Sequence, residues 1–523
     1  MSSADAFYVT TPIYYVNDVP HIGHAYTTLA CDTMARFARL DGRRVRFLTG
    51  TDEHGQKVEQ AAAARGLTPK LFTDQVSERF RTLADRMALT NDDFIRTTEE
   101  RHKRGVQALW RELARRDQIY LGSYAGWYSV RDEAFYAESE LIDGKAPTGA
   151  PVEWVEEPSY FFRLSAWQEP LLRLYEERPD FILPASRRNE VMSFVRGGLQ
   201  DLSVSRTSFR WGVSVPDDPD HIVYVWLDAL TNYMTAVGYP DVESELFRTF
   251  WPADLHVIGK DILRFHAVYW PAFLLAAGLE PPRRIYAHGW WTVEGQKISK
   301  SLGNVIDPYD LMETYGLDQT RYFLLREVPF GNDGDFSRAA MINRMNHDLA
   351  NDYGNLVQRV LSMIQRNCGG QVPAPGELSA EDRGLLEASG ALLERVRAEM
   401  AVQALSRALE LIFEVIGAAN RYVDAQAPWA LRKSDPGRMA TVLYALAETI
   451  RRLALLTQAF VPDGSARILD QLAVPEEART LASFAAEGAG LVPGTPLPAP
   501  SGVFPRFVEA SPSMPIETVA PRK

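Results

Sequence analysis

Two histidines and a glycine stand close together near the start of the chain, in the run His21-Ile22-Gly23-His24. An apolar segment typical of a strand precedes this run, and an apolar periodicity typical of a helix follows it. A helix N-terminus presents unpaired backbone N–H groups and a partial positive charge, which together favour phosphate binding. The imidazoles can donate hydrogen bonds to phosphoryl oxygens, and the glycine allows a ligand to approach closely. The run therefore predicts a phosphate site; the alternative is a plain helix start with two surface histidines.

A second candidate is the run KISKSLGN at 297–304, which is rich in lysine and serine. Lys297 and Lys300 are three residues apart, so their ammonium groups can close on negative charge that develops during a reaction. Such a run taken alone is usually a solvated surface turn. Because both runs follow predicted strands of one chain, we interpret them as two parts of one site for phosphoryl chemistry.

The segments that must position these residues alternate between strand and helix. FYVTTPIYYV and VRFLTG are rich in aromatic and β-branched residues, and the apolar spacing between them predicts a helix that ends near Gly42. The same rhythm returns in HIVYVWLDAL, ADLHVIGKDI and RRIYAHGWW. This alternation predicts a doubly wound α/β fold, in which ligands bind beyond the carboxyl ends of parallel strands.

The rest of the chain departs from this α/β pattern. Short aromatic strands interrupt it, irregular turns follow its second half, and a long stretch of helical periodicity predicts an all-α bundle. The predicted segments are 1–122 and 216–295 for the two α/β halves, 123–215 for an inserted connective subdomain, 296–342 for the KISKS loop and a stem-contact region, 343–490 for the helical domain, and 491–523 for a Pro-rich tail.

The composition restricts the class of protein. Hydrophobic residues make up 46% and charged residues 24% of 523 residues, which is typical of a globular protein with several domains. The two cysteines, Cys31 and Cys368, exclude a disulfide framework and a zinc site built from several thiolates. The first residues contain no basic n-region and no apolar run reaches membrane-spanning length, so we expect a cytoplasmic protein without a cleaved signal and without membrane contact.

The net charge of −12 argues against a protein that coats nucleic acid without specificity. It does not exclude a local basic track. If the ligand is a polyanion, we expect a narrow basic path on an otherwise negative surface.

With HIGH and KISKS in one chain, the sequence resembles the class I aminoacyl-tRNA synthetases. Within this class, the sequence is similar to the methionyl-tRNA synthetase family in the stretches TTPIYYVNDVPHIGHAY, FLTGTDEHGQK, YVWLDALTNY, HVIGKDILRFHAVYWPAFL, HGWWTVEGQKISKSLGN and HDLANDYGNLVQR. The resemblance extends from about Phe7 to about Leu472. It implies a Rossmann-like catalytic domain with an inserted connective subdomain, followed by a helical anticodon-binding domain.

The resemblance also implies a reaction. L-Methionine and ATP, as its Mg²⁺ complex, would form methionyl-adenylate, and the methionyl group would pass to the terminal adenosine of initiator and elongator tRNA(Met) for protein synthesis. Electrostatics and positioning would carry the rate without a covalent enzyme intermediate. The implied catalytic residues are His21, His24, Lys297 and Lys300, and the implied ATP site adds Gly23, Gly259, Asp261 and Ser299.

The implied methionine pocket consists of Ile13, Tyr15, Asp52, Trp226, Ala229, Leu230, Tyr233 and His266. A thioether is flexible and polarizable, so its pocket should be apolar and aromatic, while Asp52 would pair with the substrate ammonium. Without the resemblance, Trp226 and Tyr233 would be ordinary core residues, Asp52 a helix cap and His266 a packed histidine.

The helical domain contains the residues that the resemblance assigns to the CAU anticodon: Asn355, Arg359 and Trp429. Asn355 and Arg359 are four residues apart, so they share one helix face. An exposed indole beside amide and guanidinium donors suits the recognition of a single-stranded loop. The alternatives are a core tryptophan and a solvated polar pair.

The sequence departs from many relatives in its insert, which lacks the cysteines of their zinc knuckles. Ser129 and Asp132 stand where a CxxC pair would be expected. We therefore predict no zinc and no other metal site. We also predict a monomer, because the dimerising C-terminal module of some relatives has no counterpart in this sequence.

Other classes fit the sequence less well. The leucine, isoleucine and valine enzymes need a large editing insertion, and the cysteine enzyme needs thiolate zinc ligands. Small nucleotidylyltransferases share an HxGH-type helix start but lack a long helical RNA-binding domain. A non-catalytic RNA-binding paralogue is disfavoured because HIGH, KISKS and Asp52 are all intact.

Overall fold

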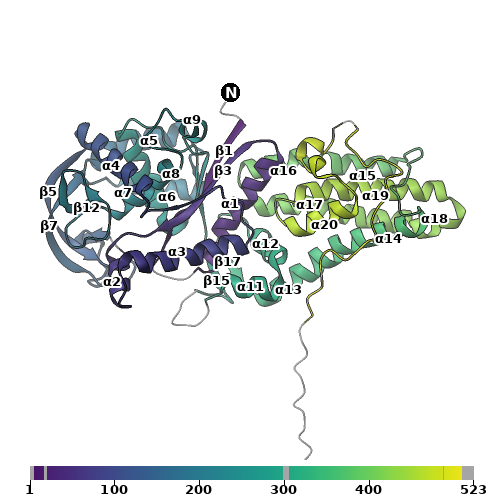
Figure 1. Cartoon of the computed structure of the whole chain (residues 1–523), viewed down its shortest axis with the longest axis horizontal. Coiled ribbons are helices and arrows are strands. Elements are labelled where there is room, and N and C mark those ends of the chain that lie inside the picture. The colour runs from purple at the N-terminus through teal and green to yellow at the C-terminus, as the bar shows by residue number, and fades with distance from the viewer. Residues whose placement is uncertain (1–4, 17–19, 133, 298–304, 487, 509–523) are drawn as a thin grey trace, which may run out of the picture.

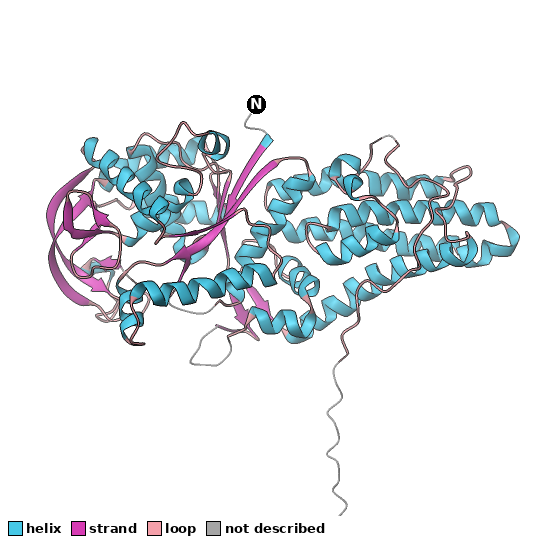
Figure 2. Ribbon diagram, viewed as in Figure 1, coloured by secondary structure: helices cyan, strands magenta, loops and turns pink. Residues whose placement is uncertain are grey.

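The structure is a computed structural model of the whole chain, and it describes residues 5–16, 20–132, 134–297, 305–486 and 488–508. An α/β half and a helical half lie end to end along the longest axis (Figure 1). Figure 2 shows the strands gathered in the first half and long helices filling the second. Within the described part of the chain, no helix has the length and apolarity of a membrane span.

A seven-stranded parallel sheet forms the centre of the α/β half. Its order is β2-β3-β1-β13-β14-β8, and β4 also pairs with β3. The strands are β1 (Ala6–Thr10), β2 (Tyr14–Tyr15), β3 (Arg44–Asp52), β4 (Asp93–Arg96), β8 (Ile182–Leu183), β13 (Leu255–Gly259) and β14 (Ile285–His288). Because β1 pairs with β3 on one side and β13 on the other, the strand order reverses at β1, where doubly wound folds bind ligands.

Helices accompany this sheet, and α1 (Ile22–Leu40) is the one that begins at the HIGH run. The others are α2 (Gln56–Ala63), α3 (Pro69–Arg86), α4 (Glu100–Arg115), α5 (Gln168–Glu177), α6 (Ala185–Arg196), α7 (Val225–Leu230), α8 (Asn232–Thr235), α9 (Glu245–Phe250) and α10 (Trp270–Ala276). The last six residues of β3 are all buried, as expected of a parallel strand in a covered sheet.

The inserted region forms a separate antiparallel sheet with the order β6-β5-β7-β9. Its strands are β5 (Ile119–Ser129), β6 (Ala134–Tyr136), β7 (Glu153–Phe162) and β9 (Leu202–Ser203). The insert predicted at 123–215 does not coincide with this sheet, because β8 lies inside that range and pairs with β14 of the central sheet. A two-residue strand has no periodicity that the sequence could reveal.

Two small sheets complete the strands. One has the order β10-β12-β11 and comprises β10 (Ser205–Arg206), β11 (Ser214–Val215) and β12 (Asp218–Val223). The other has the order β16-β15-β17 and comprises β15 (Trp291–Val293), β16 (Gln296–Lys297) and β17 (Gly334–Phe336). The second sheet and the helices α11 (Pro308–Tyr315), α12 (Leu317–Arg326) and α13 (Arg338–Asn343) connect the two halves of the molecule.

The helical half begins with a π-helical segment, Arg344–Gly354, that continues directly into α14 (Asn355–Asn367). The remaining helices are α15 (Ala380–Gly390), α16 (Leu392–Ala401), α17 (Leu405–Gln426), α18 (Pro428–Ser434), α19 (Pro436–Thr457) and α20 (Pro462–Gln471). Proline opens α18, α19 and α20, where its missing N–H costs no helical hydrogen bond. Residues of α1, α12 and these helices share one continuous hydrophobic core, which joins the two halves.

The described part of the Pro-rich tail packs against the helical half. Val503 and Phe504 are buried, and the Phe504 ring lies 5.6 Å from that of Tyr353. The backbone N–H of Val372 donates to the carbonyl of Thr495 over 2.9 Å. The described part of this stretch is therefore tied to the bundle by packing and by hydrogen bonds.

Candidate active site

The two histidines of the HIGH run close the N-terminus of α1. His21 has extended backbone angles and is the N-cap residue. Its Nδ1 accepts from the N–H of Gly23 over 3.1 Å, and its own N–H donates to Nδ1 of His24 over 3.2 Å, which makes a reciprocal cap. Because both Nδ1 atoms accept, each neutral ring carries its hydrogen on Nε2, the form that can donate to a phosphoryl oxygen. A Cβ at Gly23 would lie 2.9 Å from the His21 ring, so the cap requires glycine there.

Aromatic side chains enclose His24 at this helix end. Its ring lies 4.7 Å from Tyr14 of β2 and 5.3 Å from Phe80 of α3, both in edge-on geometry. Burial, followed by the neighbouring His21, holds the pKa of His24 well below its usual range. His24 is therefore a neutral hydrogen-bond donor at physiological pH and not a cation.

Asp52 lies at the carboxyl end of β3, directly opposite Tyr15 of β2. The side chain is buried, and its backbone carbonyl accepts from the N–H of Val16 over 3.2 Å. The next residue, Glu53, is fixed by Arg96, whose Nε donates to Oε1 over 2.6 Å. The backbone hydrogen bond from Val16 and the Glu53–Arg96 ion pair thus hold the chain at Asp52, as a residue that pairs with a ligand charge requires.

Tyr233 and His266 form the interior wall of the predicted methionine pocket. His266 Nδ1 lies 3.0 Å from the carbonyl of Ile262, so this nitrogen carries the hydrogen. Nε2 must then accept from the Tyr233 hydroxyl, 2.7 Å away. Burial lowers the pKa of His266 to about 4 and keeps the ring neutral. The Tyr233 ring also stacks on His256 at a centroid distance of 4.1 Å.

The other predicted methionine-binding residues gather around this pair. Trp226, on α7, is partly buried and stacks on Phe265 with ring centroids 3.8 Å apart. Its ring lies 6.1 Å from that of His266. Ala229 and Leu230 are buried on the same helix, and Ile13 packs against the cluster that contains Tyr233. The structure places most of these residues in one hydrophobic cluster, and their role in methionine binding stays a prediction.

The predicted adenosine side lies where β13 and β14 end together. Gly259 pairs with His288, and the His288 Nε2 lies 2.7 Å from Thr27 Oγ1 on α1. A Cβ at Gly259 would lie 2.5 Å from the Asp261 carboxylate, which accepts from the indole N–H of Trp290 over 3.2 Å. His288 and Trp290 are not among the predicted site residues, although both stand in HGWW at the end of a predicted strand.

The KISKS segment falls largely outside the described residues. The backbone of Lys297 pairs with Thr292 in the small sheet β16-β15-β17, and Ser299 and Lys300 are not described. Beyond the segment, the carbonyl of Ile306 accepts from the N–H of Ile22, the first residue of α1, over 3.2 Å. The chain after KISKS therefore contacts the HIGH run directly, although the roles predicted for the two lysines and the serine stay predictions.

The predicted anticodon residues form a cluster on the helical half. Asn355 is exposed at the start of α14, one helical turn before Arg359. The Arg359 guanidinium lies 5.8 Å from the centre of the Trp429 ring and donates to Asp424 over 2.8 Å. Trp429 is 52% exposed, which is unusual for so large an apolar side chain and excludes the core alternative.

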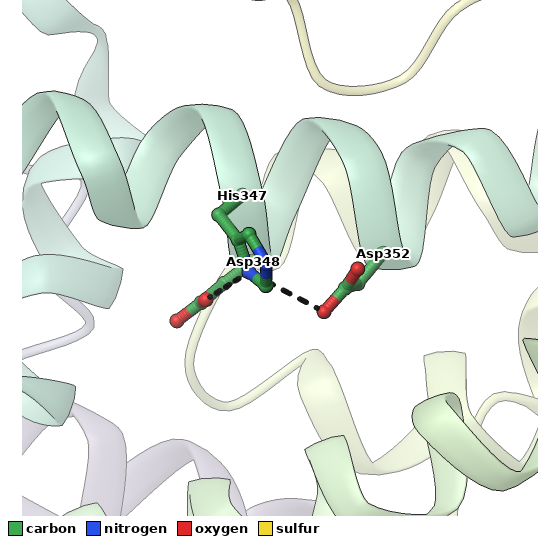
Figure 3. Close-up of side chains that lie close together, drawn as sticks. All are labelled: His347, Asp348 and Asp352. Atoms are coloured by element: carbon green, nitrogen blue, oxygen red, sulfur yellow. Dashed lines mark hydrogen bonds and ion pairs between the residues drawn. The ribbon is translucent and has the colours of Figure 1, made fainter.

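Among the described residues, one group has the spacing of metal ligands: His347, Asp348 and Asp352 (Figure 3). His347 Nδ1 lies 3.3 Å from Asp348 Oδ1 and 3.6 Å from Asp352 Oδ2. Asp348 also accepts from Tyr322 over 2.8 Å and pairs with Arg344 over 3.0 Å. Tyr322 and Arg344 thus hold Asp348 in place, while the ion pair of Asp352 is with His347 alone among the described residues.

In the turn where a CxxC pair would be expected from the resemblance, hydrogen bonds connect Asp132 to its neighbours. The backbone N–H of Asp132 donates to Ser129 Oγ over 3.2 Å. Its carboxylate accepts from the hydroxyls of Tyr136, at 3.1 Å, and Thr148. Burial raises the pKa of Asp132, but the hydrogen bonds from Thr148 and Tyr136 outweigh it and lower the pKa overall. A carboxylate with several donors thus occupies this place in the turn.

Comparison with known proteins identifies the family. The family model of tRNA synthetases class I (M) matches residues 7–151 and 140–361, and that of the anticodon binding domain of methionyl tRNA ligase matches 372–513. A methionine–tRNA ligase of Mesorhizobium japonicum is 57% identical over 97% of this chain and 99% of its own length. One from Brucella suis is 56% identical over the same shares.

Solved structures agree with these sequence matches. The Mycobacterium tuberculosis methionyl-tRNA synthetase in complex with methionyl-adenylate superposes with a TM-score of 0.93 at 54% identity, covering 96% of this chain and all of that one. The apo form of that enzyme gives a TM-score of 0.87 at 51% identity, covering 97% of this chain and 99% of that one. These matches and the observed sheet and bundle confirm the predicted fold class. The chain therefore belongs to the methionyl-tRNA synthetase family of class I aminoacyl-tRNA ligases.

Proposed function

We propose that the protein is a methionine–tRNA ligase, which joins L-methionine to tRNA(Met) through methionyl-adenylate with ATP as the energy source. The observation that carries this proposal is one continuous set of contacts around the ends of the parallel strands. Asp52 lies opposite Tyr15, and the adjacent Tyr14 contacts His24 of the phosphate-binding helix end. Beyond β1 in the same sheet, Gly259 of β13 pairs with His288 of β14. His288 in turn contacts Thr27 of the same helix.

Methionine would be held at both ends. The Asp52 carboxylate would pair with its ammonium, and the aromatic wall of Trp226, Tyr233 and His266 would take the thioether. The contacts Tyr233–His266 and Trp226–Phe265 support this role because they fix the ring orientations before any ligand arrives. The neutral His266 suits an apolar side chain better than a cation would.

ATP, with its Mg²⁺, would lie along the helix end. The methionine carboxylate would attack the α-phosphorus in line, with pyrophosphate as the leaving group. His21 and His24 would donate to phosphoryl oxygens, supported by the Nε2–H form that their caps impose. Lys297 and Lys300 would supply positive charge from the KISKS segment, and Ile306, which follows that segment, contacts the first residue of α1. Gly23, Gly259, Asp261 and Ser299 would contact the nucleotide.

The transfer step would need tRNA at both halves of the molecule. The exposed Trp429 would stack on an anticodon base, and Arg359 and Asn355 would donate to base edges. The terminal adenosine would enter the catalytic half, where its 2′ hydroxyl attacks the methionyl carbonyl carbon of the adenylate and AMP leaves, as the class I resemblance implies.

Amino-acid-dependent exchange of pyrophosphate into ATP, measured with all twenty amino acids, tests the first step. We expect exchange with methionine to exceed exchange with every other amino acid. A maximum on another amino acid would contradict the substrate, and the absence of any exchange would instead favour a non-catalytic RNA-binding protein. Aminoacylation of tRNA with and without the CAU anticodon then tests the transfer step. Equal rates would refute the anticodon roles proposed for Asn355, Arg359 and Trp429.

We further propose that the protein is a monomer without zinc in its insert. The hydrogen bonds of Asp132 with Ser129, Tyr136 and Thr148 support the second point, because they hold the turn with protein groups alone. Metal analysis of the purified protein would refute it by finding one tightly bound zinc per chain. Sedimentation analysis should give the mass of one 58.7 kDa chain. A location in the cytoplasm stays a prediction from the sequence.

A further inference from the structure

Three ionisable side chains lie buried together behind the proposed methionine pocket, and none belongs to the residues assigned so far. Asp228 and His102 have no exposed side-chain surface, and His54 is 3% exposed. His54 Nδ1 lies 2.6 Å from one Asp228 oxygen, and His102 Nε2 lies 2.8 Å from the other. A single carboxylate thus accepts from two imidazoles that are far apart in the sequence.

The three residues come from the elements that carry the proposed pocket. His54 follows β3 and stands two residues after Asp52, the proposed partner of the ammonium. Asp228 lies on α7, between Trp226 and Ala229 of the proposed methionine pocket. His102 lies on α4, which otherwise contributes no proposed pocket residue. The carboxylate therefore joins the two sides of the methionine pocket to each other and to a third element.

The connection continues into α8, the helix of Tyr233. His102 Nδ1 lies 3.0 Å from Thr235 Oγ1, so the ring of His102 contacts α7 and α8 at once. The two helices α4 and α8 are in close contact here, because a Cβ at Gly105 would lie 2.1 Å from the Thr235 side chain. On the opposite side, the Trp211 ring lies edge-on to His54 at 5.6 Å, and its indole N–H donates to the carbonyl of Glu53 over 2.6 Å.

The chemistry of Asp228 is specific to a carboxylate. An ionised carboxylate has acceptor oxygens only, so it can serve two N–H donors at once, whereas an amide offers one oxygen and one NH₂ group. Burial alone would raise the pKa of Asp228, but the two imidazoles, His54 first, hold it at about 2. The group is thus charged throughout the physiological range.

We propose that Asp228 is a positioning residue for methionine recognition: held by His54 and His102, it fixes α7 against the end of β3. It thereby sets the spacing between Asp52 and the aromatic wall at Trp226 to the length of an unbranched thioether side chain. This inference rests on the proposed function. The alternative is a buried ionic cluster that affects only the stability of the fold.

Variants that keep or remove single donors separate the two possibilities. A glutamine amide can place its nitrogen near the Nε2 position of His102, so His102→Gln keeps a donor to Asp228, whereas His102→Met removes it at similar volume. Likewise His54→Asn keeps a donor near Nδ1, and His54→Leu removes it. Asp382→Asn is the control: Asp382 is also fully buried, is held by Arg438 with a pKa of about 2, and lies in the helical half.

The readout is methionine-dependent exchange, with the KM values for methionine and ATP measured separately. We expect the donor-lacking variants to raise the KM for methionine about tenfold or more, with the KM for ATP within about twofold of wild type. The donor-keeping variants should stay within about threefold of wild type for both substrates. The preference for methionine over ethionine, which is one methylene longer, should also fall in the donor-lacking variants and not in Asp382→Asn.

Three outcomes would overturn the positioning role. Donor-keeping and donor-lacking variants could behave alike, the KM for ATP could rise in step with that for methionine, or Asp382→Asn could reproduce the effect. If a donor-lacking variant does not fold, Asp228→Asn, which keeps one acceptor, is measured in its place with the same expectation. Wild-type exchange decides the proposed function independently: inactivity of wild type with methionine refutes that function, whereas an active wild type with unchanged variants refutes only the role of Asp228.

Discussion

The catalytic half and the helical half of the molecule present their key aromatic residues in opposite ways. Tyr233, in the proposed methionine pocket, is 1% exposed and hydrogen-bonded to the buried His266. Trp429, on the helical half, is 52% exposed and has the Arg359 guanidinium beside its ring. Tyr233 is thus held in one orientation by its neighbours before a ligand binds, whereas the Trp429 ring is open to solvent.

This difference follows from the size of the two proposed ligands. A small amino acid offers few contacts, so its site must exclude water and hold each group in place before binding. A tRNA anticodon brings bases that can stack on an exposed ring, and most of its affinity comes from a large and wet interface. Burial should therefore determine the effect of a mutation in the first region, and charge and stacking should determine it in the second.

The largest expected effect tests the buried region. Replacing Asp52 by asparagine leaves the methionine ammonium without its partner in a buried place. Removing one side of a buried ion pair costs about 3–5 kcal/mol, so kcat/KM for methionine in the exchange reaction should fall by roughly a hundred- to several thousandfold. The KM for ATP should stay close to wild type.

The matched control for this change is Asp424→Asn in the helical half, where the acid is largely exposed. It should leave exchange with methionine unchanged. A loss of less than about threefold in Asp52→Asn would show that the ammonium is bound elsewhere and would remove Asp52 from the pocket.

A second effect of burial appears as a pH dependence of stability. The pKa of His266 is about 4 in the folded protein because burial disfavours its charged form, whereas 6.5 is its ordinary value. Between these values the unfolded chain binds the proton more readily, so the free energy of unfolding falls as the pH drops from about 6.5 and levels off below about 4. The full contribution is roughly 3 kcal/mol.

Replacing His266 by glutamine should remove this part of the pH dependence. Urea unfolding of both proteins between pH 7.5 and 4 measures it, and the two curves of stability against pH should converge toward low pH. At pH 7.5 His266 is neutral in both the folded and the unfolded protein. The difference in the free energy of unfolding between the two proteins at that pH therefore reports only the lost hydrogen bonds. Parallel curves over the whole range would mean that the folded and unfolded protein bind the His266 proton over the same pH range, so that burial does not lower its pKa.

The third effect tests the exposed region. Replacing Trp429 by alanine removes the stacking surface, which is worth about 1–3 kcal/mol per base. Aminoacylation of tRNA(Met) should therefore fall by roughly ten- to a hundredfold in kcat/KM for tRNA, and exchange without tRNA should not change. Trp429→Phe should keep part of the activity, since a smaller ring still stacks. A parallel fall in exchange would show that the ring acts on the fold and not on RNA.

The sequence was informative where one local segment contains both the structure and the chemistry. The spacing of His21, Gly23 and His24 before an apolar helix predicted the helix start, and the apolar run before Asp52 predicted a strand with a functional end. The resemblance added Trp429 and Arg359, which are 70 residues apart and in contact in the structure.

The rest depends on contacts between distant segments. β8 has two residues, and only its pairing with β14 makes it a strand of the central sheet. In the sequence, Asp228 is one polar residue in an apolar run. Its partners, His54 and His102, lie 174 and 126 residues away. The protonation form of His266 likewise depends on the carbonyl of Ile262 and the hydroxyl of Tyr233. No periodicity or spacing encodes such pairs.

The smallest expected effect concerns Asp424, which accepts from Arg359 over 2.8 Å beside Trp429. Exposed ion pairs contribute about 0–1 kcal/mol, so Asp424→Asn should change the free energy of unfolding by less than about 1 kcal/mol. Removing this negative charge from an RNA-binding face should lower the KM for tRNA slightly, by less than about fivefold at low salt. The gain should fade as salt increases, because exposed charges are then screened.

The direction of this small change separates two roles of the acid. If Asp424 only adds negative charge near the RNA, the KM for tRNA falls in Asp424→Asn and rises in Arg359→Gln. If Asp424 instead orients Arg359 for a base edge, its loss raises the KM for tRNA in the same direction as the loss of Arg359. Because the Arg359 guanidinium also lies over the Trp429 ring, the indole can orient it without the acid. We therefore expect opposite signs, measured as aminoacylation at two salt concentrations with both variants.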